Sequence, residues 1–153
     1  AFHAWELDIL YISQSKCCSV GKILVGYDGS EGAKKALDRA VTMVKEGDEI
    51  VVLFVVPPAK IEEFVGFDTD LTVEKAQEML DEAVGSLEES GIPVTSMVKE
   101  GDVAGEIIEL GAELGCDLIV VGSYGLSKVG VFALGDVAEE VAKKATRPVL
   151  LIR

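Results

Sequence analysis

The sequence predicts a single α/β domain, with an open five-stranded parallel sheet of Rossmann-like type and helices on both faces. Two observations carry this prediction. Short apolar runs alternate along the chain with stretches that have a one-sided apolar stripe. The run Glu49–Val56 is apolar at nearly every residue, which is typical of a parallel strand buried on both faces. A chain of 153 residues is long enough for one such domain.

The first strand and helix are predicted from residue 22 onward. Lys22–Asp28 is a β-branched run that ends in a glycine-bearing turn, after which Ser30 can cap a helix. Gly47 ends that helix before the second strand, Glu49–Val56, which stops at two prolines. The helix has one apolar stripe, formed by Ala33, Ala36, Leu37, Ala40, Val41 and Val44.

A less regular stretch, Ala59–Asp70, separates the second strand from a second helix that closes near Gly91. Pro93–Lys99 then alternates between polar and apolar residues, as expected of an edge strand. The apolar stripe of the second helix comprises Val73, Ala76, Leu80, Ala83, Val84 and Leu87.

Two more helices and two more strands complete the prediction. Asp102 can cap a third helix, and Cys116–Gly122 is a compact apolar fourth strand. A glycine-rich loop leads into a fourth helix, and Pro148 restarts the chain as the fifth strand. The inward residues of the two helices are Val103, Ile107, Ile108 and Leu114, followed by Leu134, Val137, Ala138, Val141, Ala142 and Ala145.

The polarity of the strands predicts their order. The third strand is the polar one and belongs at an edge, whereas the first and fourth are short and apolar. With right-handed crossovers this favours the order 3-2-1-4-5. Ligands of such sheets bind beyond the carboxyl ends of the strands where the winding reverses. We therefore expect a ligand site between Gly26–Ser30 and Gly122–Gly125.

Charge and hydropathy exclude several partners. With 27 acidic and 14 basic residues, the chain should be repelled by nucleic acid and by anionic membranes. It has no basic stripe interleaved with aromatics and no apolar run of about 20 residues. The leading segment has no basic start and contains Glu6 and Asp8, so it is a poor signal peptide, and we expect a cytoplasmic protein.

Histidine and cysteine provide no obvious reactive centre. The one histidine, His3, lies in the leading segment, which argues against a Ser-His-acid triad and histidine-based metal ligation. Cys116 begins an apolar strand, as a small buried hydrophobe would. Cys17 and Cys18 are adjacent rather than spaced as C-x-x-C, and a redox or metal role for them stays open.

Four stretches stand out in the chain: an opening strand into YDGS with Asp28, the Val55-Val56-Pro57 end of the second strand, DLIVVGSYGLS, and PVLLIR. With these features the sequence resembles the universal stress protein family from Lys22 to Arg153, nearly the whole chain. The family's nucleotide-binding members show G-x2-G-x9-G-[ST] after the fourth strand. This chain has glycines at those spacings, namely Gly122, Gly125 and Gly135.

The resemblance implies a homodimeric stress-response module, in some members with ATP held at the reversal point. It implies that Asp28 contacts the ribose and phosphate region, that Val56 meets adenine through its backbone, and that Val121 flanks the nucleoside. The implied phosphate cradle consists of Gly122, Ser123, Gly125, Gly135 and Asp136. The family's last strand pairs antiparallel with its copy, which here implies Val149, Leu150, Leu151 and Ile152.

The chain departs from the family pattern where a phosphate would bind. Asp136 replaces a serine or threonine that could donate to phosphate, while Tyr124 and Val131 stand where basic residues are common. Two like charges about 4 Å apart repel by about 1 kcal/mol in water and about 4 kcal/mol at an effective dielectric constant of 20. We therefore expect ATP binding to be weakened or lost, unless Mg²⁺ or Mn²⁺ bridges Asp136 and the phosphates.

Several alternatives stay open. Asp136 could be only a helix cap, and Asp28 could only cap the first helix through its turn. The leading function is a non-enzymatic binding module with unidentified protein partners, and the second is an ATP-binding sensor with at most slow hydrolysis. A receiver domain lacks its acidic cluster here, and neither a P-loop nor G-x-G-x-x-G occurs.

The domain prediction assigns residues 21–153 to the α/β domain and residues 1–20 to an extension of uncertain structure. The extension could add a strand to a sheet edge, pack across a dimer partner, form a tail, or come from an untranslated start. The residues alone do not decide among these alternatives.

Overall fold

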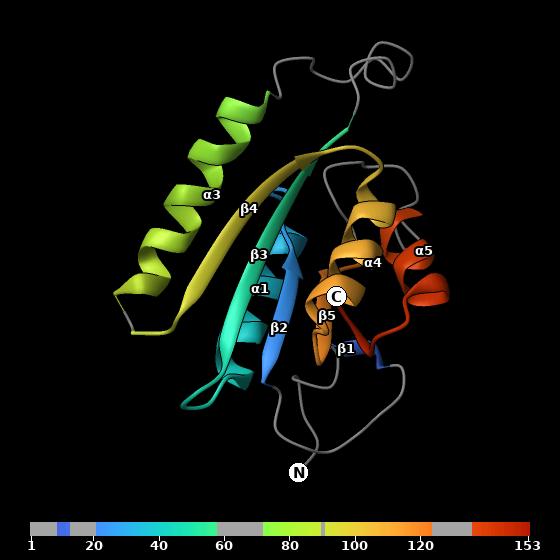
Figure 1. The fold of residues 1–153 in the computed structure, drawn as a ribbon, viewed down its shortest axis with the longest axis horizontal. Coiled ribbons are helices and arrows are strands. Elements are labelled where there is room, and N and C mark those ends of the chain that lie inside the picture. Colours follow the sequence, from blue (N-terminus) through green and yellow to red (C-terminus); the bar gives the residue numbers. More distant parts are fainter. Residues whose placement is uncertain (1–8, 13–20, 58–71, 90, 124–135) are drawn as a thin grey trace.

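The computed structural model describes residues 9–12, 21–57, 72–89, 91–123 and 136–153. These residues form one six-stranded sheet with helices on either side (Figure 1). The strands are β1 (Ile9–Ile12), β2 (Lys22–Gly26), β3 (Glu49–Val56), β4 (Val94–Glu100), β5 (Leu118–Gly122) and β6 (Val149–Ile152). The helices are α1 (Glu31–Met43), α3 (Val73–Glu88), α4 (Val103–Leu114) and α5 (Asp136–Lys144).

The strand order is β1-β6-β5-β2-β3-β4, and the five strands from β2 to β6 are parallel. The predicted order 3-2-1-4-5 is therefore confirmed for the parallel core. Beyond the five predicted parallel strands, the sheet has a sixth strand, β1, which runs antiparallel to β6. Of the alternatives for the leading segment, residues 9–12 thus follow the edge-strand option. The outer edge of β6, expected to pair with a second copy, is paired with β1.

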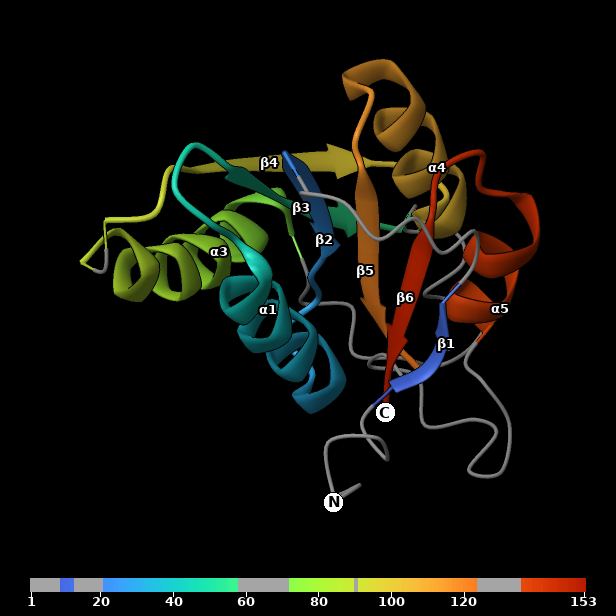
Figure 2. The same cartoon turned by 90° about the horizontal axis from the view of Figure 1, so that it is seen from below.

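The sheet is covered on both faces. Helices α1 and α3 lie on one face, and α4 and α5 lie on the other (Figure 2). The inner strand β3 is apolar throughout because its alternate residues enter the two cores on opposite faces of the sheet. Ile50, Val52 and Phe54 pack with α1 and α3, whereas Val51, Leu53 and Val55 pack on the other face.

The helices begin at the residues that cap them. The side chains of Ser30, Thr72 and Asp102 each accept a hydrogen bond from the N–H group three residues further on, at 3.2, 3.1 and 2.9 Å. The caps at Ser30 and Asp102 confirm the prediction from sequence. Helix α4 ends at Gly115, whose positive φ of 61° is the left-handed conformation that favours glycine.

One close backbone contact fixes α1 against the end of β5. A Cβ atom added to Gly122 would lie 2.6 Å from the carbonyl carbon of Gly32 and 2.7 Å from its oxygen. No side-chain rotation can relieve such a clash, because the atoms it meets belong to the backbone. Glycine at position 122 is therefore required by packing of β5 against the first turn of α1, whether or not a phosphate binds there.

We expect Gly122→Ala to lower the free energy of unfolding by about 1–3 kcal/mol, because the added methyl group must displace the start of α1. Gly85→Ala is the matched control. Gly85 is exposed within α3, and an added Cβ would meet nothing within 4 Å. That control should raise stability by about 0.5–1 kcal/mol. Denaturant unfolding of both variants checks this, and equal stability of Gly122→Ala and the wild type would contradict it.

Candidate functional site

The carboxyl ends of β2 and β5 lie side by side where the strand order reverses. Ile23, Leu24 and Val25 of β2 pair with Leu118, Ile119 and Val120 of β5. The chain leaves β2 toward α1 on one face, whereas α5, which follows β5 in the chain, covers the opposite face. The segment around Asp28 and the segment Gly122–Ser123 thus lie together at the carboxyl ends of the strands, as predicted.

Asp28 organises the turn between β2 and α1. Its Oδ1 atom accepts a hydrogen bond from the N–H group of Ser30 at 2.9 Å. Ser30 in turn caps α1, so Asp28 holds the residue that starts the helix. Gly29 between them has a φ of 81°, and a Cβ there would collide with Met79 of α3. The turn-capping role of Asp28 is therefore confirmed, and its contact with a ribose stays a prediction.

Tyr27, beside Asp28, was not identified from the sequence. It is 7% exposed, and its ring meets that of Phe54 edge-on, with 6.3 Å between centroids. Burial raises the pKa of its hydroxyl, and the nearby carboxylates Asp28 and Glu82 raise it further. The phenol is therefore protonated at neutral pH. Its position directly after a strand was the signal available in the sequence.

The backbone of Val56 joins the end of β3 to the end of β4. Its carbonyl oxygen accepts a hydrogen bond from the N–H group of Gly101 at 3.0 Å. The side chain is buried. Val56 thus lies at the carboxyl end of the strand next to β2, as predicted, and its contact with adenine through the backbone stays a prediction.

Ser123 carries an unusual polar group. The residue is 1% exposed, and its N–H group donates to the carbonyl oxygen of Ile152 at 2.7 Å. Its hydroxyl is the one buried side-chain polar atom without a hydrogen-bond partner in the part of the chain that the structure describes. A buried polar group left unpaired costs about 1–3 kcal/mol. The preceding Val121 is buried in the core shared with α4 and α5.

Two of the predicted cradle residues, Gly125 and Gly135, lie outside the described residues, as do Tyr124 and Val131. Asp136 is the first residue of α5, which confirms its expected place at the start of that helix. Its side chain lies outside what the structure describes. The cradle is therefore described at Gly122 and Ser123 and through the backbone of Asp136.

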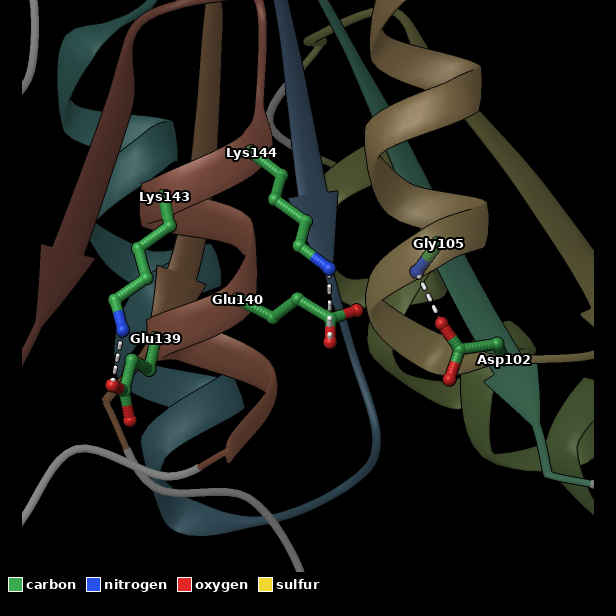
Figure 3. Close-up of polar contacts among 6 residues, drawn as sticks. All are labelled: Asp102, Gly105, Glu139, Glu140, Lys143 and Lys144. Atoms are coloured by element: carbon green, nitrogen blue, oxygen red, sulfur yellow. Dashed lines mark hydrogen bonds and ion pairs between the residues drawn. The ribbon is translucent and has the colours of Figure 1, made fainter.

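The charges of α5 follow the helix dipole (Figure 3). Glu139 pairs with Lys143 at 2.8 Å and Glu140 pairs with Lys144 at 3.8 Å, each pair four residues apart and solvent-exposed. The hydrogen bond lowers the pKa of Glu139 and raises that of Lys143. Both lysines lie in the last turn, so the described cations of α5 are at the end opposite Asp136.

The neighbouring helix α4 shows how a carboxylate can act at the N-terminus of a helix. Asp102 accepts a hydrogen bond from the N–H group of Gly105 at 2.9 Å (Figure 3). This places a negative charge where the N–H groups and the dipole of α4 favour an anion. Residue 136 is also an aspartate, and it is the first residue of α5.

Within the described residues, no three His, Cys, Asp or Glu side chains are grouped so that they could hold a metal ion. In the same part of the chain, no helix is both long and apolar enough to cross a membrane. Cys116 is fully buried, and burial raises its pKa, as expected of an inert thiol. Cys17 and Cys18 lie outside the described residues.

Comparison with known proteins identifies the family. The model of the universal stress protein family matches residues 19–153. Universal stress protein MJ0531 of Methanocaldococcus jannaschii is 33% identical over 141 residues, covering 86% of this chain and 81% of that protein. Universal stress protein YxiE of Bacillus subtilis is 32% identical over 145 residues, covering 86% and 98%.

Solved structures agree with the sequence comparison. The structure of the hypothetical protein MJ0577 superposes with a TM-score of 0.77 at 30% identity, covering 88% of this chain and 96% of that one. A universal stress protein described as a complex with cAMP has a TM-score of 0.66 at 25% identity, covering 89% and 98%. The chain therefore belongs to the universal stress protein family.

Proposed function

We propose that this protein is a non-enzymatic stress-response module that binds an adenine nucleotide at the carboxyl ends of β2, β3 and β5, with affinity for ATP reduced by Asp136. The observation that carries the proposal is the unpaired, buried hydroxyl of Ser123 at the point where the strand order reverses. The similarity to a universal stress protein described with cAMP supports a nucleotide as the ligand class.

The charges near this point disfavour a triphosphate. Lys34, in the first turn of α1, pairs with Glu31 at 3.8 Å. Lys99, near the end of β4, pairs with Glu106 at 3.8 Å. Both lysines are therefore already partnered by carboxylates, and Asp136 adds a further negative residue at the start of α5. A nucleotide with one phosphate carries less charge and should be tolerated better than ATP.

A catalytic role is disfavoured by the chemistry of the same residues. The hydroxyl of Ser123 is buried and has no hydrogen-bond partner among the described residues, whereas a serine nucleophile needs an adjacent base. The only histidine of the chain, His3, lies in the leading segment. We therefore propose that nucleotide binding changes the contacts of the protein with its partners rather than leading to hydrolysis.

The second candidate is an ATP-binding sensor in which Mg²⁺ or Mn²⁺ bridges Asp136 and the phosphates. Hard divalent cations take carboxylate and phosphate oxygens together, so the carboxylate would become a ligand instead of a repelling charge. This alternative is favoured by the residue type at position 136. It differs from the first proposal in requiring metal for any ATP binding.

We expect Asp136→Ser to tighten binding of metal-free ATP by at least about fivefold, because removing one repelling charge about 4 Å from a phosphate is worth about 1 kcal/mol or more. Isothermal titration calorimetry of nucleotide-stripped protein, with and without Mg²⁺ or Mn²⁺, measures this. Glu139→Gln is the matched control, since it removes an exposed carboxylate of the same helix that is already paired with Lys143.

The two candidates predict different outcomes for the metal. Under the first, Asp136→Ser improves ATP binding without metal. Under the second, the wild type binds ATP only with metal, and Asp136→Ser loses that dependence. Equal affinities of the wild type and Asp136→Ser under every condition would contradict both, because the charge at position 136 would then have no effect on phosphate binding.

We expect Ser123→Ala to have opposite effects on stability and on binding. In the nucleotide-free protein it should raise the free energy of unfolding by about 1 kcal/mol, because a buried unpaired hydroxyl is removed. It should also weaken binding of AMP or cAMP severalfold. Ser86→Ala is the control, since that exposed hydroxyl already donates to the carbonyl oxygen of Ala83 at 3.0 Å. Unchanged nucleotide affinity of Ser123→Ala would contradict a ligand role for this hydroxyl.

A further inference from the structure

The outer edge of β6 is covered by the leading segment of the same chain. Strand β1 runs antiparallel to β6, with Ile9 opposite Ile152, Tyr11 opposite Leu151 and Ile12 opposite Leu150. Figure 2 shows β1 alongside β6, at the opposite end of the sheet from β4. The register shifts between Ile9 and Tyr11, so the pairing is short and irregular.

Without β1, the edge of β6 would be open and apolar. All four residues of β6 are at most 2% exposed in the described structure. Removing β1 would uncover one row of N–H and C=O groups on a strand of the sequence VLLI. Such an edge is a template for pairing with another strand. The family match begins at residue 19, so β1 lies outside the part of the chain that defines the family.

The geometry of β1 is the one that a second copy of β6 would adopt. Two identical strands related by a two-fold axis pair antiparallel, and β1 is antiparallel to β6. The sequences also match in character, because ILYI and VLLI are both four-residue apolar strands. The first segment of this chain therefore presents to β6 what another copy of β6 would present.

We propose that β1 is an internal cap that blocks self-pairing of this protein, and that its release exposes β6 for antiparallel pairing with β6 of a second copy. The cap is short enough to be released, since it has four residues, an interrupted register, and hydrogen bonds that each contribute a net stability of about 0.5–1.5 kcal/mol. Dimerisation through β6 then becomes conditional on the state of residues 9–12. This inference does not depend on the proposed nucleotide site.

The test compares the mass of the full chain with that of two variants by sedimentation velocity over a wide concentration series. In the full chain, Tyr11→Pro breaks β1, because proline removes an N–H group and fixes φ. The second variant begins at Val20 and keeps every element from β2 to β6. We expect the full chain to sediment at its monomer mass of 16.2 kDa and both variants to reach twice that mass as concentration rises.

Phe2→Pro is the matched control, because it places the same residue in the leading segment but outside β1, and it should leave the mass unchanged. Hydrogen exchange provides the second readout. Because Pro148 and Ile152 turn their carbonyl oxygens toward β5, the N–H group of Leu151 between them faces the outer edge. The amide of Leu151 should be protected in the full chain at every concentration, and in Tyr11→Pro only where the dimer forms.

Three results would overturn the proposal. One is a full chain that is already dimeric and that becomes monomeric with Tyr11→Pro, which would mean that β1 is exchanged between copies. Another is a variant that keeps its helical circular dichroism and stays monomeric at all concentrations. The last is unfolding of both variants, because β1 would then belong to the folding core instead of acting as a releasable cap.

Discussion

Helices bury the inner strands of the sheet on both faces, and this burial decides where the molecule can carry polar groups. Strand β3 is buried from Ile50 to Val56, with alternate side chains packed into the two cores. A sheet covered in this way has no polar face to offer a ligand. Polar chemistry is therefore confined to the ends of the strands, and the reversal between β2 and β5 is where two chain segments diverge to opposite faces.

The same constraint makes the two sheet edges differ. Strand β4 is half-exposed along its length and carries polar residues, so its composition protects that edge. Strand β6 is apolar and buried, and its edge is protected by a covering strand. The β4 edge is thus protected from further pairing by its polar residues, and the β6 edge by the strand that covers it. Only the protection of β6 can be switched on and off, since β1 can leave whereas the residues of β4 are fixed.

The sequence predicted the parallel core, because periodicity and strand polarity are local properties. Alternate burial of β3 and the edge position of β4 followed from such patterns. Contacts between segments that are far apart in the chain could not be predicted from these local patterns. Gly122 matched a phosphate-binding motif, yet its contact is with the backbone of Gly32, about ninety residues away in the chain. The position of β1 likewise depends on β6, and nothing in ILYI alone selects that partner.

The candidate site was predicted less completely than the fold, for a physical reason. Asp28 and Ser123 could be recognised in the sequence as residue types, but their roles depend on hydrogen bonds that the sequence does not show. Asp28 is engaged by the N–H group of Ser30, so capping accounts for that interaction without a ligand. Ser123 is the opposite case, because its buried hydroxyl has no partner among the described residues. A residue that is satisfied by the fold supports the turn, whereas an unsatisfied one indicates a role that the described fold does not supply.

Asp136 at the N-terminus of α5 can be compared with the residues that begin the other helices. Each of the other described helices begins with an oxygen-bearing cap and a carboxylate in its first turn, namely Ser30 with Glu31, Thr72 with Glu74, and Asp102 with Glu106. A carboxylate at the start of α5 is therefore in keeping with the whole chain, whose net charge is −13. The protein supplies its own anions where helix dipoles favour them. Under the proposed function, a phosphate at α5 would compete with such a built-in charge. We therefore expect the number of phosphates, more than the adenine ring, to decide which nucleotide binds.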